Sequence, residues 1–108
     1  MPLLTIVASG ARTVSSSVVP LAGSAGFTTL RVQLDATAAS GTTPTLDVVI
    51  EDTIDGTNYN AIATFTQLTA AGRQVVNVTT PFADTIRARW TITGTTPSFT
   101  FSVIAWGE

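Results

Sequence analysis

Four stretches of the sequence alternate between apolar and polar residues with a period of two. They cover 29–36, 46–51, 86–93 and 98–103, and two less regular stretches, 60–67 and 73–79, are rich in β-branched residues. Alternation of this kind predicts strands with one buried and one exposed face. The inward-facing residues predicted from the four regular stretches are Leu30, Val32, Leu34, Ala36, Leu46, Val48, Ile50, Ile86, Ala88, Trp90, Ile92, Phe99, Phe101 and Val103.

Turn-forming residues separate these stretches about every ten residues, and no window has the spacing of a capped helix. Short strands at such intervals are typical of a single antiparallel β-sandwich, and the pattern favours an all-β fold of the jelly-roll type. The tetrapeptide Gly-Thr-Thr-Pro occurs twice, at 41–44 and 94–97. We interpret both copies as hairpin loops, so that 28–37 returns as 45–52 and 85–93 returns as 98–106.

The first 25 residues differ from the rest, which divides the chain into an N-terminal segment, 1–25, and a sandwich domain, 26–108. Residues 3–8 are apolar on both faces, whereas the next stretch is rich in Ser, Gly and Ala. A strand of that kind must be covered on both faces. Two interpretations remain open: a strand of its own sandwich followed by a surface loop, or an arm that adds to a neighbouring subunit. In the second case the expected interface residues are Leu3, Leu4, Ile6, Val7 and Arg12.

Two large apolar residues near the C-terminal end fall on the outward side of their strand. Continuing the alternation of Phe99, Phe101 and Val103 places Ile104 and Trp106 outside. Exposed aromatic residues commonly mark interfaces, although the N-terminal segment could also cover them within the same chain. Ile104 and Trp106 therefore complete the predicted interface.

The charge content argues against several kinds of partner. The chain has 44% apolar but only 11% charged residues, with five arginines, no lysine and a formal net charge of −2. A surface with so few cations gives no electrostatic basis for binding nucleic acid or anionic membrane. We find neither a secretory signal nor an apolar run long enough to span a bilayer. Uncharged, threonine-rich faces instead favour self-association, for which we expect a trimer.

The residues needed for most catalytic sites are missing. The chain has neither histidine nor cysteine, which excludes imidazole and thiolate metal sites and both kinds of nucleophilic triad. Glu51 and Asp52 are neighbours on a strand and should point to opposite faces, so only Asp52 and Asp55 could converge. The Asp55-Gly56 pair is explained by a turn without calcium. We therefore expect no enzymatic activity, no metal and no cofactor.

Residues 41–106 resemble the small β-sandwich structural proteins of tailed bacteriophages and prophages. The resemblance is carried by a strand that ends in the turn Asp-Gly-Thr-Asn-Tyr at 55–59, a Thr/Ala-Gly segment after it, the strand Ile-Arg-Ala-Arg-Trp at 86–90 and the closing hairpin segment Gly-Thr-Thr-Pro-Ser-Phe at 94–99. It implies a virion component made in the host cytoplasm and placed on the capsid surface. The implied role is decoration of the head lattice, with the major capsid protein or other virion proteins as partners. A neck or tail component is the alternative within this family.

A second resemblance leads to another class of function. Asp-Gly-Thr-Asn-Tyr at 55–59, followed later by Asp-Thr-Ile-Arg-Ala-Arg-Trp at 84–90, is similar to the discoidin-like jelly-roll modules. Several such modules bind sugars through loops at one end of the sandwich, which implies a non-catalytic carbohydrate-binding module. The residues that this resemblance would place in the loop site are Asn58, Tyr59, Asn60 and Arg73.

Overall fold

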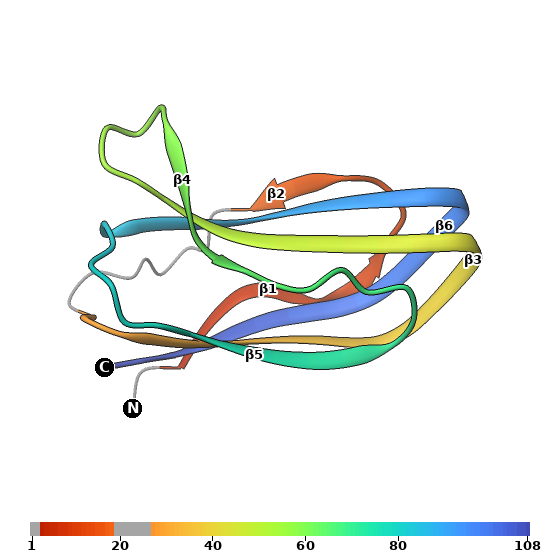
Figure 1. Cartoon of the computed structure of the whole chain (residues 1–108), viewed down its shortest axis with the longest axis horizontal. Coiled ribbons are helices and arrows are strands. Elements are labelled where there is room, and N and C mark those ends of the chain that lie inside the picture. Colours follow the sequence, from red (N-terminus) through yellow and green to blue (C-terminus); the bar gives the residue numbers. More distant parts are fainter. Residues whose placement is uncertain (1–2, 19–26) are drawn as a thin grey trace.

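The computed structural model describes residues 3–18 and 27–108, and the regular structure in this part of the chain consists of strands alone. The predicted all-β fold is confirmed, and every strand pair is antiparallel. The boundary expected between residues 25 and 26 lies outside the described residues, as does most of the Ser/Gly/Ala-rich stretch. The strands are β1 (Leu3–Arg12), β2 (Ser16–Val18), β3 (Leu30–Thr53), β4 (Tyr59–Thr64), β5 (Gly72–Val78) and β6 (Thr85–Gly107) (Figure 1).

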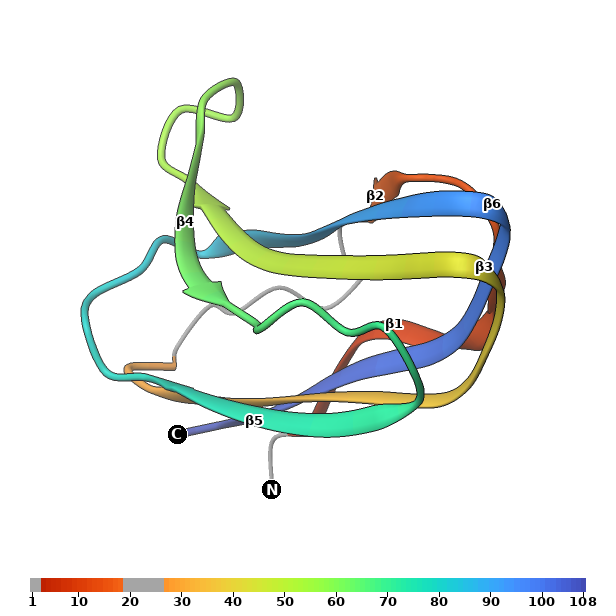
Figure 2. The ribbon, with the colours of Figure 1, turned by 45° about the vertical axis from the view of Figure 1, so that its right-hand side comes forward.

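Two long strands, β3 and β6, form the backbone of the fold. They pair with each other along their whole length, from Leu30 opposite Gly107 to Thr53 opposite Thr85. Both strands bend where the two Gly-Thr-Thr-Pro segments lie, and each passes from one layer of the sandwich into the other (Figure 2). The predicted pair of hairpins is therefore wrong, because each segment lies within a continuous strand.

The bends depend on backbone that only glycine tolerates well. Gly41 and Gly94 have φ angles of 110° and 123°, in the region that side chains disfavour. A Cβ atom on Gly94 would lie 2.9 Å from the Cα atom of Pro44, so each bend also needs the space that a side chain would occupy. Glycine and proline are common in hairpin loops for the same local reasons, which is why the pattern alone could not distinguish a bend from a hairpin.

The bends divide the pairing into two four-stranded sheets. The first half of β6 and the second half of β3 pair with β2 and β4, giving the order β2–β6–β3–β4. The remaining halves pair with β1 and β5, giving the order β1–β6–β3–β5. Eight strand segments arranged in this way form a jelly-roll sandwich. We refer to the two layers as the β2–β4 sheet and the β1–β5 sheet.

The core lies between the two sheets and contains the residues that the alternation predicts. All the residues predicted to face inward from the four regular stretches are less than 9% exposed, and Trp90 packs edge-on against Phe101 with ring centroids 5.5 Å apart. Because successive strand residues point to opposite faces, a correct period also assigns the outer surface. The core residues beyond those predicted are Leu4, Ile6, Val7, Ala63, Phe65, Val78 and Ala105.

Strand β1 belongs to the sandwich of its own chain, as the first of the two interpretations held. It pairs with β6 from Leu3 opposite Trp106 to Arg12 opposite Phe99. The register shifts between Thr5 and Val7, and this bulge allows Ile6 and Val7 to point inward together. A strand that is apolar at consecutive positions is thereby explained without a neighbouring subunit.

Candidate functional site

The outer face of the β1–β5 sheet gathers three of the six exposed large apolar residues in the described part of the chain. Leu3, Val75 and Trp106 are 61%, 43% and 37% exposed, and the half-buried Ile104 lies among them. We call the outward-facing residues of this sheet the Trp106 face; they are Leu3, Thr5, Arg31, Gln33, Asp35, Arg73, Val75, Asn77, Ser102, Ile104 and Trp106.

The strand register arranges this face in three rows that cross the sheet. The end row contains Leu3, Trp106, Arg31 and Asn77 in that order. The central row contains Thr5, Ile104, Gln33 and Val75, and the opposite row contains Ser102, Asp35 and Arg73. Directly opposed residues on neighbouring strands are close enough for their side chains to touch, so each row forms a continuous surface.

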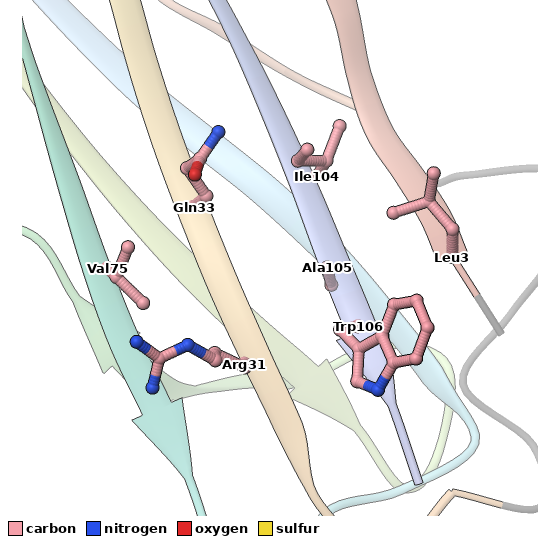
Figure 3. A pocket seen from close by; sticks show the side chains of 7 residues that line it. All are labelled: Leu3, Arg31, Gln33, Val75, Ile104, Ala105 and Trp106. Carbon is pink, nitrogen blue, oxygen red and sulfur yellow. The ribbon is translucent and has the colours of Figure 1, made fainter. Parts of the chain in front are cut away.

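A shallow hollow of about 200 Å³ lies within the end and central rows, between the side chains of β1 and β6 and those of β3 and β5 (Figure 3). Leu3, Ile104 and Trp106 line one side of it, while Arg31, Gln33 and Val75 line the other (Figure 3). A second hollow of about 280 Å³ lies on the other side of Trp106 and Arg31, toward Asn77 and Glu108. Exposed apolar groups gathered in this way, with polar side chains around them, are typical of a binding surface.

Polar groups on the face are placed to form further hydrogen bonds. Arg31 donates from Nη1 to the Asn77 side-chain oxygen over 3.0 Å, which holds its guanidinium toward β5, on the side of β3 away from Trp106 (Figure 3). Asp35 and Arg73 are opposed across β3 and β5 but form no ion pair or side-chain hydrogen bond with the described residues. The arrangement can therefore bind an apolar group while offering charges and amides to a partner.

The structure separates the predicted interface residues into two groups. Leu4, Ile6 and Val7 are at most 4% exposed and lie in the core of their own sandwich, so they are not available as anchors for a neighbour. Ile104 and Trp106 lie on the Trp106 face as the parity of their strand predicts, and Leu3 of β1 lies next to them on the same face and does not cover them. Their contact with a partner stays a prediction.

Arg12, the remaining predicted interface residue, forms contacts within its own chain. Its guanidinium donates to the carbonyl oxygens of Ala8, Gly10 and Phe101 over 2.7–3.1 Å. It also lies over the rings of Trp90 and Phe101, 5.2 and 4.8 Å from their centroids. Burial lowers the pKa of Arg12 from its ordinary value, in keeping with this internal position. Arg12 thus closes the edge of the sandwich beside β1.

The alternative loop site is not assembled. Tyr59 is opposed to Thr53 in the β2–β4 sheet, whereas Arg73 is opposed to Asp35 in the other sheet. The Tyr59 ring instead packs under the Arg87 guanidinium, 3.6 Å from the centroid. Asn58 donates to Asp55 in its own loop, and Asn60 is exposed on β4. These residues were expected in loops at one end of the sandwich. The bend in β3 instead places Tyr59 and Arg73 in different sheets.

The carboxylates considered for catalysis or calcium binding have structural partners. Asp55 accepts hydrogen bonds from the backbone N–H groups of Asn58 and Thr57, which lower its pKa below the usual range. Asp52 accepts from the Ala83 N–H group over 2.8 Å and does not converge with Asp55. Among residues 3–18 and 27–108, no group of three or more acidic, His or Cys residues is placed to hold a metal ion.

Glu51 lies on the outer side of the β2–β4 sheet between two arginines. It accepts from Arg87 Nε over 2.8 Å and from Arg89 Nε over 3.3 Å. Burial alone would raise its pKa, but the hydrogen bonds and charges of Arg89 and Arg87 outweigh that effect and lower it. Glu51 therefore remains ionised as a structural ion pair.

Sequence reasoning found Trp106 and Ile104 but did not assemble the surface around them. Arg31 and Gln33 were predicted to face outward, yet nothing in the sequence indicated that β3 lies beside the C-terminal half of β6. Val75 and Asn77 belong to a stretch whose alternation was too irregular to assign. No helix in the described residues is long and apolar enough to cross a membrane.

Comparison with known proteins identifies the fold but no family. No protein-family model matches the chain, and no curated protein sequence matches it. Solved structures do match, among them a chain from infectious bursal disease virus, Gt strain, with a TM-score of 0.56, 16% identity and 96% of the present chain covered. A chain of broad bean stain virus matches with a TM-score of 0.53, 12% identity and 90% coverage.

Carbohydrate-binding modules form a second group of structural neighbours. The Clostridium thermocellum xylanase 10B fragment with its CBM22-1 and GH10 modules, complexed with xylohexaose, has a TM-score of 0.55, 13% identity and 99% of the present chain covered. A family 29 carbohydrate-binding module has a TM-score of 0.50, 8% identity and 98% coverage. The chain spans 32% of the bursal disease virus chain, 24% of the xylanase chain and 88% of the family 29 module. At these identities the likeness shows a jelly-roll fold shared with viral capsid proteins and carbohydrate-binding modules.

Proposed function

We propose that this chain is a non-enzymatic structural protein of a virus particle and that it binds other protein subunits through the Trp106 face. The observation that carries the proposal is the cluster of Leu3, Ile104 and Trp106 on the outside of a well-packed sandwich. Such a cluster is costly to expose unless a partner covers it. Viral capsid chains that share the fold over most of its length support the same class of function.

The specific role proposed is decoration of a tailed-bacteriophage head, with the major capsid protein or another virion protein as partner. A small domain that binds only the assembled lattice stabilises that lattice by mass action. Because the lattice repeats the same site many times, modest contacts add up through avidity.

Quantitative mass spectrometry of purified particles from the source tests this proposal. A ratio to the major shell protein near one, or a simple fraction of it, is expected for a decoration protein. A handful of copies would move the protein to the neck or tail, and absence from particles would overturn the proposal. These copy numbers follow from ring and lattice symmetry.

Particle-binding assays with variants test the surface itself. Trp106→Ala should reduce attachment about tenfold or more, beyond any loss that thermal melting attributes to stability, because the side chain is 37% exposed on this face. Ile54→Ala is the matched control, since Ile54 is an apolar residue that is 87% exposed in the loop before β4. Equal attachment of both variants would exclude the Trp106 face as the binding surface.

A carbohydrate-binding module is the second candidate, and the composition of the hollow favours it. The Trp106 indole faces Arg31 and Gln33 across the hollow, and an aromatic ring opposite hydrogen-bonding side chains is suited to a sugar ring. The family 29 module is also close to this chain in length. Binding of the isolated monomer to immobilised glycans, lost in Trp106→Ala but kept in Tyr59→Ala, would support this candidate over the virion role.

A further inference from the structure

The three rows of the Trp106 face differ in side-chain size and charge. The end row carries the large side chains of Leu3 and Trp106 and the positive charge of Arg31. In the opposite row Ser102 lies on the same strand as Trp106, and Asp35 lies on the same strand as Arg31. On β1 the corresponding stretch is the bulge between Val7 and Gly10, which contains only the small residues Ala8 and Ser9.

These differences make the face complementary to itself. Rotation by 180° about an axis along the central row places a second copy face to face with the first. The end row of each copy then lies over the opposite row of the other, so that Trp106 meets Ser102 and Arg31 meets Asp35. Leu3 meets the small residues of the bulge, and Asn77 meets Arg73. The central row meets itself, bringing Ile104, Gln33 and Val75 against their own counterparts.

We infer that the Trp106 face binds a second copy of this chain in a two-fold contact between sheets. This inference rests on the proposed function, because it names the partner of the same surface. Face-to-face packing of sheets with nearly aligned strands is an ordinary geometry in proteins, and a two-fold contact uses the same patch on both subunits. Large residues over small ones and cations over anions provide the complementarity that such a contact needs.

The charges of the face support this occupant over an unrelated partner. Asp35 makes no ion pair with the described residues of its own chain, although Arg73 is opposed to it on the next strand. Arg31 uses one nitrogen on Asn77, and the rest of its guanidinium is exposed. In the two-fold contact the Arg31 of each copy lies over the Asp35 carboxylate of the other copy, so two charge pairs form at once.

The size of the face limits the strength of the contact. Four strands about 4.8 Å apart and about five residues of about 3.3 Å give a patch of roughly 19 by 17 Å per copy. An interface of this size is at or below the low end of specific protein contacts, so we expect a micromolar dimer. A dimer of this kind replaces the trimer expected from the sequence, because a two-fold contact closes with two copies.

Charge exchange provides a direct test by sedimentation velocity over micromolar to millimolar concentrations. Asp35→Arg should weaken self-association at least about tenfold, since it brings two cations together, and Arg31→Asp should do the same with two anions. The double variant with both changes should restore most of the dimer, because the new carboxylate on each copy then meets the new guanidinium on the other. Asp47→Arg, which changes the charge by the same amount on the β2–β4 sheet, is the matched control and should leave association unchanged.

The outcomes separate this inference from the proposed function. A wild-type chain that stays monomeric to millimolar concentration would overturn the dimer, even if the chain is found on virus particles. A dimer without rescue in the double variant would overturn the stated pairing of Arg31 with Asp35. A dimer with rescue, in a protein that is absent from particles, would support the inference and overturn the virion role. Thermal melting of each variant shows whether a loss of association comes from unfolding.

Discussion

Gly41 lies directly against Pro97 where the two paired long strands bend. A Cβ atom on Gly41 would be 2.9 Å from the Cα atom of Pro97 and 2.7 Å from the Thr96 carbonyl oxygen. Gly94 has the equivalent relationship to Pro44, at 2.9 Å. The two Gly-Thr-Thr-Pro segments therefore pack on each other as a nearly symmetric pair, and this pair holds the two sheets at the bend.

Alanine at either glycine should destabilise the fold through two separate effects. Gly41→Ala places a side chain at a φ angle of 110°, which costs about 1–3 kcal/mol, and the new methyl group also overlaps backbone, which costs about 1–3 kcal/mol more. Gly56→Ala isolates the first effect, because Gly56 has a φ angle of 83° but open space around it. In urea unfolding, Gly41→Ala and Gly94→Ala should have a lower free energy of unfolding than Gly56→Ala. Equal losses of free energy in the three variants would contradict the close packing at the bend.

Gln74 should contribute more to stability than its position at a sheet edge indicates. Its amide accepts from the Thr66 N–H group over 2.9 Å and donates to the Thr66 carbonyl over 2.8 Å, joining β5 to the segment after β4. We expect Gln74→Ala to lower the free energy of unfolding by about 1–3 kcal/mol. Gln67→Ala, which removes a single exposed hydrogen bond to Asp47, is the control and should cost little. Comparable losses in the two variants would show that the double hydrogen bond adds nothing.

Arg12 should be sensitive to shape as well as charge. Its planar guanidinium donates hydrogen bonds to three carbonyl oxygens and lies over two aromatic rings. The ammonium group of a lysine cannot make all of these contacts. Arg12→Lys and Arg12→Ala should therefore both lower stability, by about 1–3 kcal/mol. Arg73→Ala removes an exposed arginine without such contacts and should change stability by less than about 0.5 kcal/mol. Full stability in Arg12→Lys would show that charge alone matters.

Acidification should destabilise the protein through Glu51 and Asp55. The pKa values of both groups are lowered in the folded state, so each contributes stability that is fully present above its unfolded pKa, near about 4. That contribution is lost as the pH falls through the lower folded value. Denaturant unfolding at several pH values should show the decline beginning below about pH 4.5.

The Glu51→Gln variant assigns part of that pH dependence. It should be less stable than wild type at neutral pH, because Arg87 and Arg89 lose their common carboxylate. It should also lose less stability on acidification, since only one of the two carboxyl groups with a lowered pKa remains. An unchanged acid profile would assign the dependence to Asp55 and the remaining carboxylates.

Much of the core could be predicted because strand alternation is a local property. Val32, Ile50 and Phe101 were placed inside from their immediate neighbours alone, and each is fully buried. The same parity placed Trp106 outside, where it is 37% exposed. A period of two in a half-buried strand leaves no freedom to exchange the two faces, so these assignments needed no knowledge of which strands pair.

Contacts between distant segments were decided only in the tertiary structure. The Gly-Thr-Thr-Pro segments form bends and not hairpins, because β3 and β6 pair with each other instead of folding back on themselves. Arg12 is half-buried against its own chain because the rings of Trp90 and Phe101 lie beside the end of β1.

The alternation of residues along the chain was enough to predict the fold class, the buried residues of the regular strands and the exposure of Trp106. The tertiary structure decided that Trp106 lies next to Arg31 and Leu3, and that Arg73 is far from the loop at Tyr59. The physical reason is that periodicity records only which side of a strand meets water. Which strands become neighbours depends on pairing over the whole chain, and a binding surface made from four strands exists only after that pairing is complete.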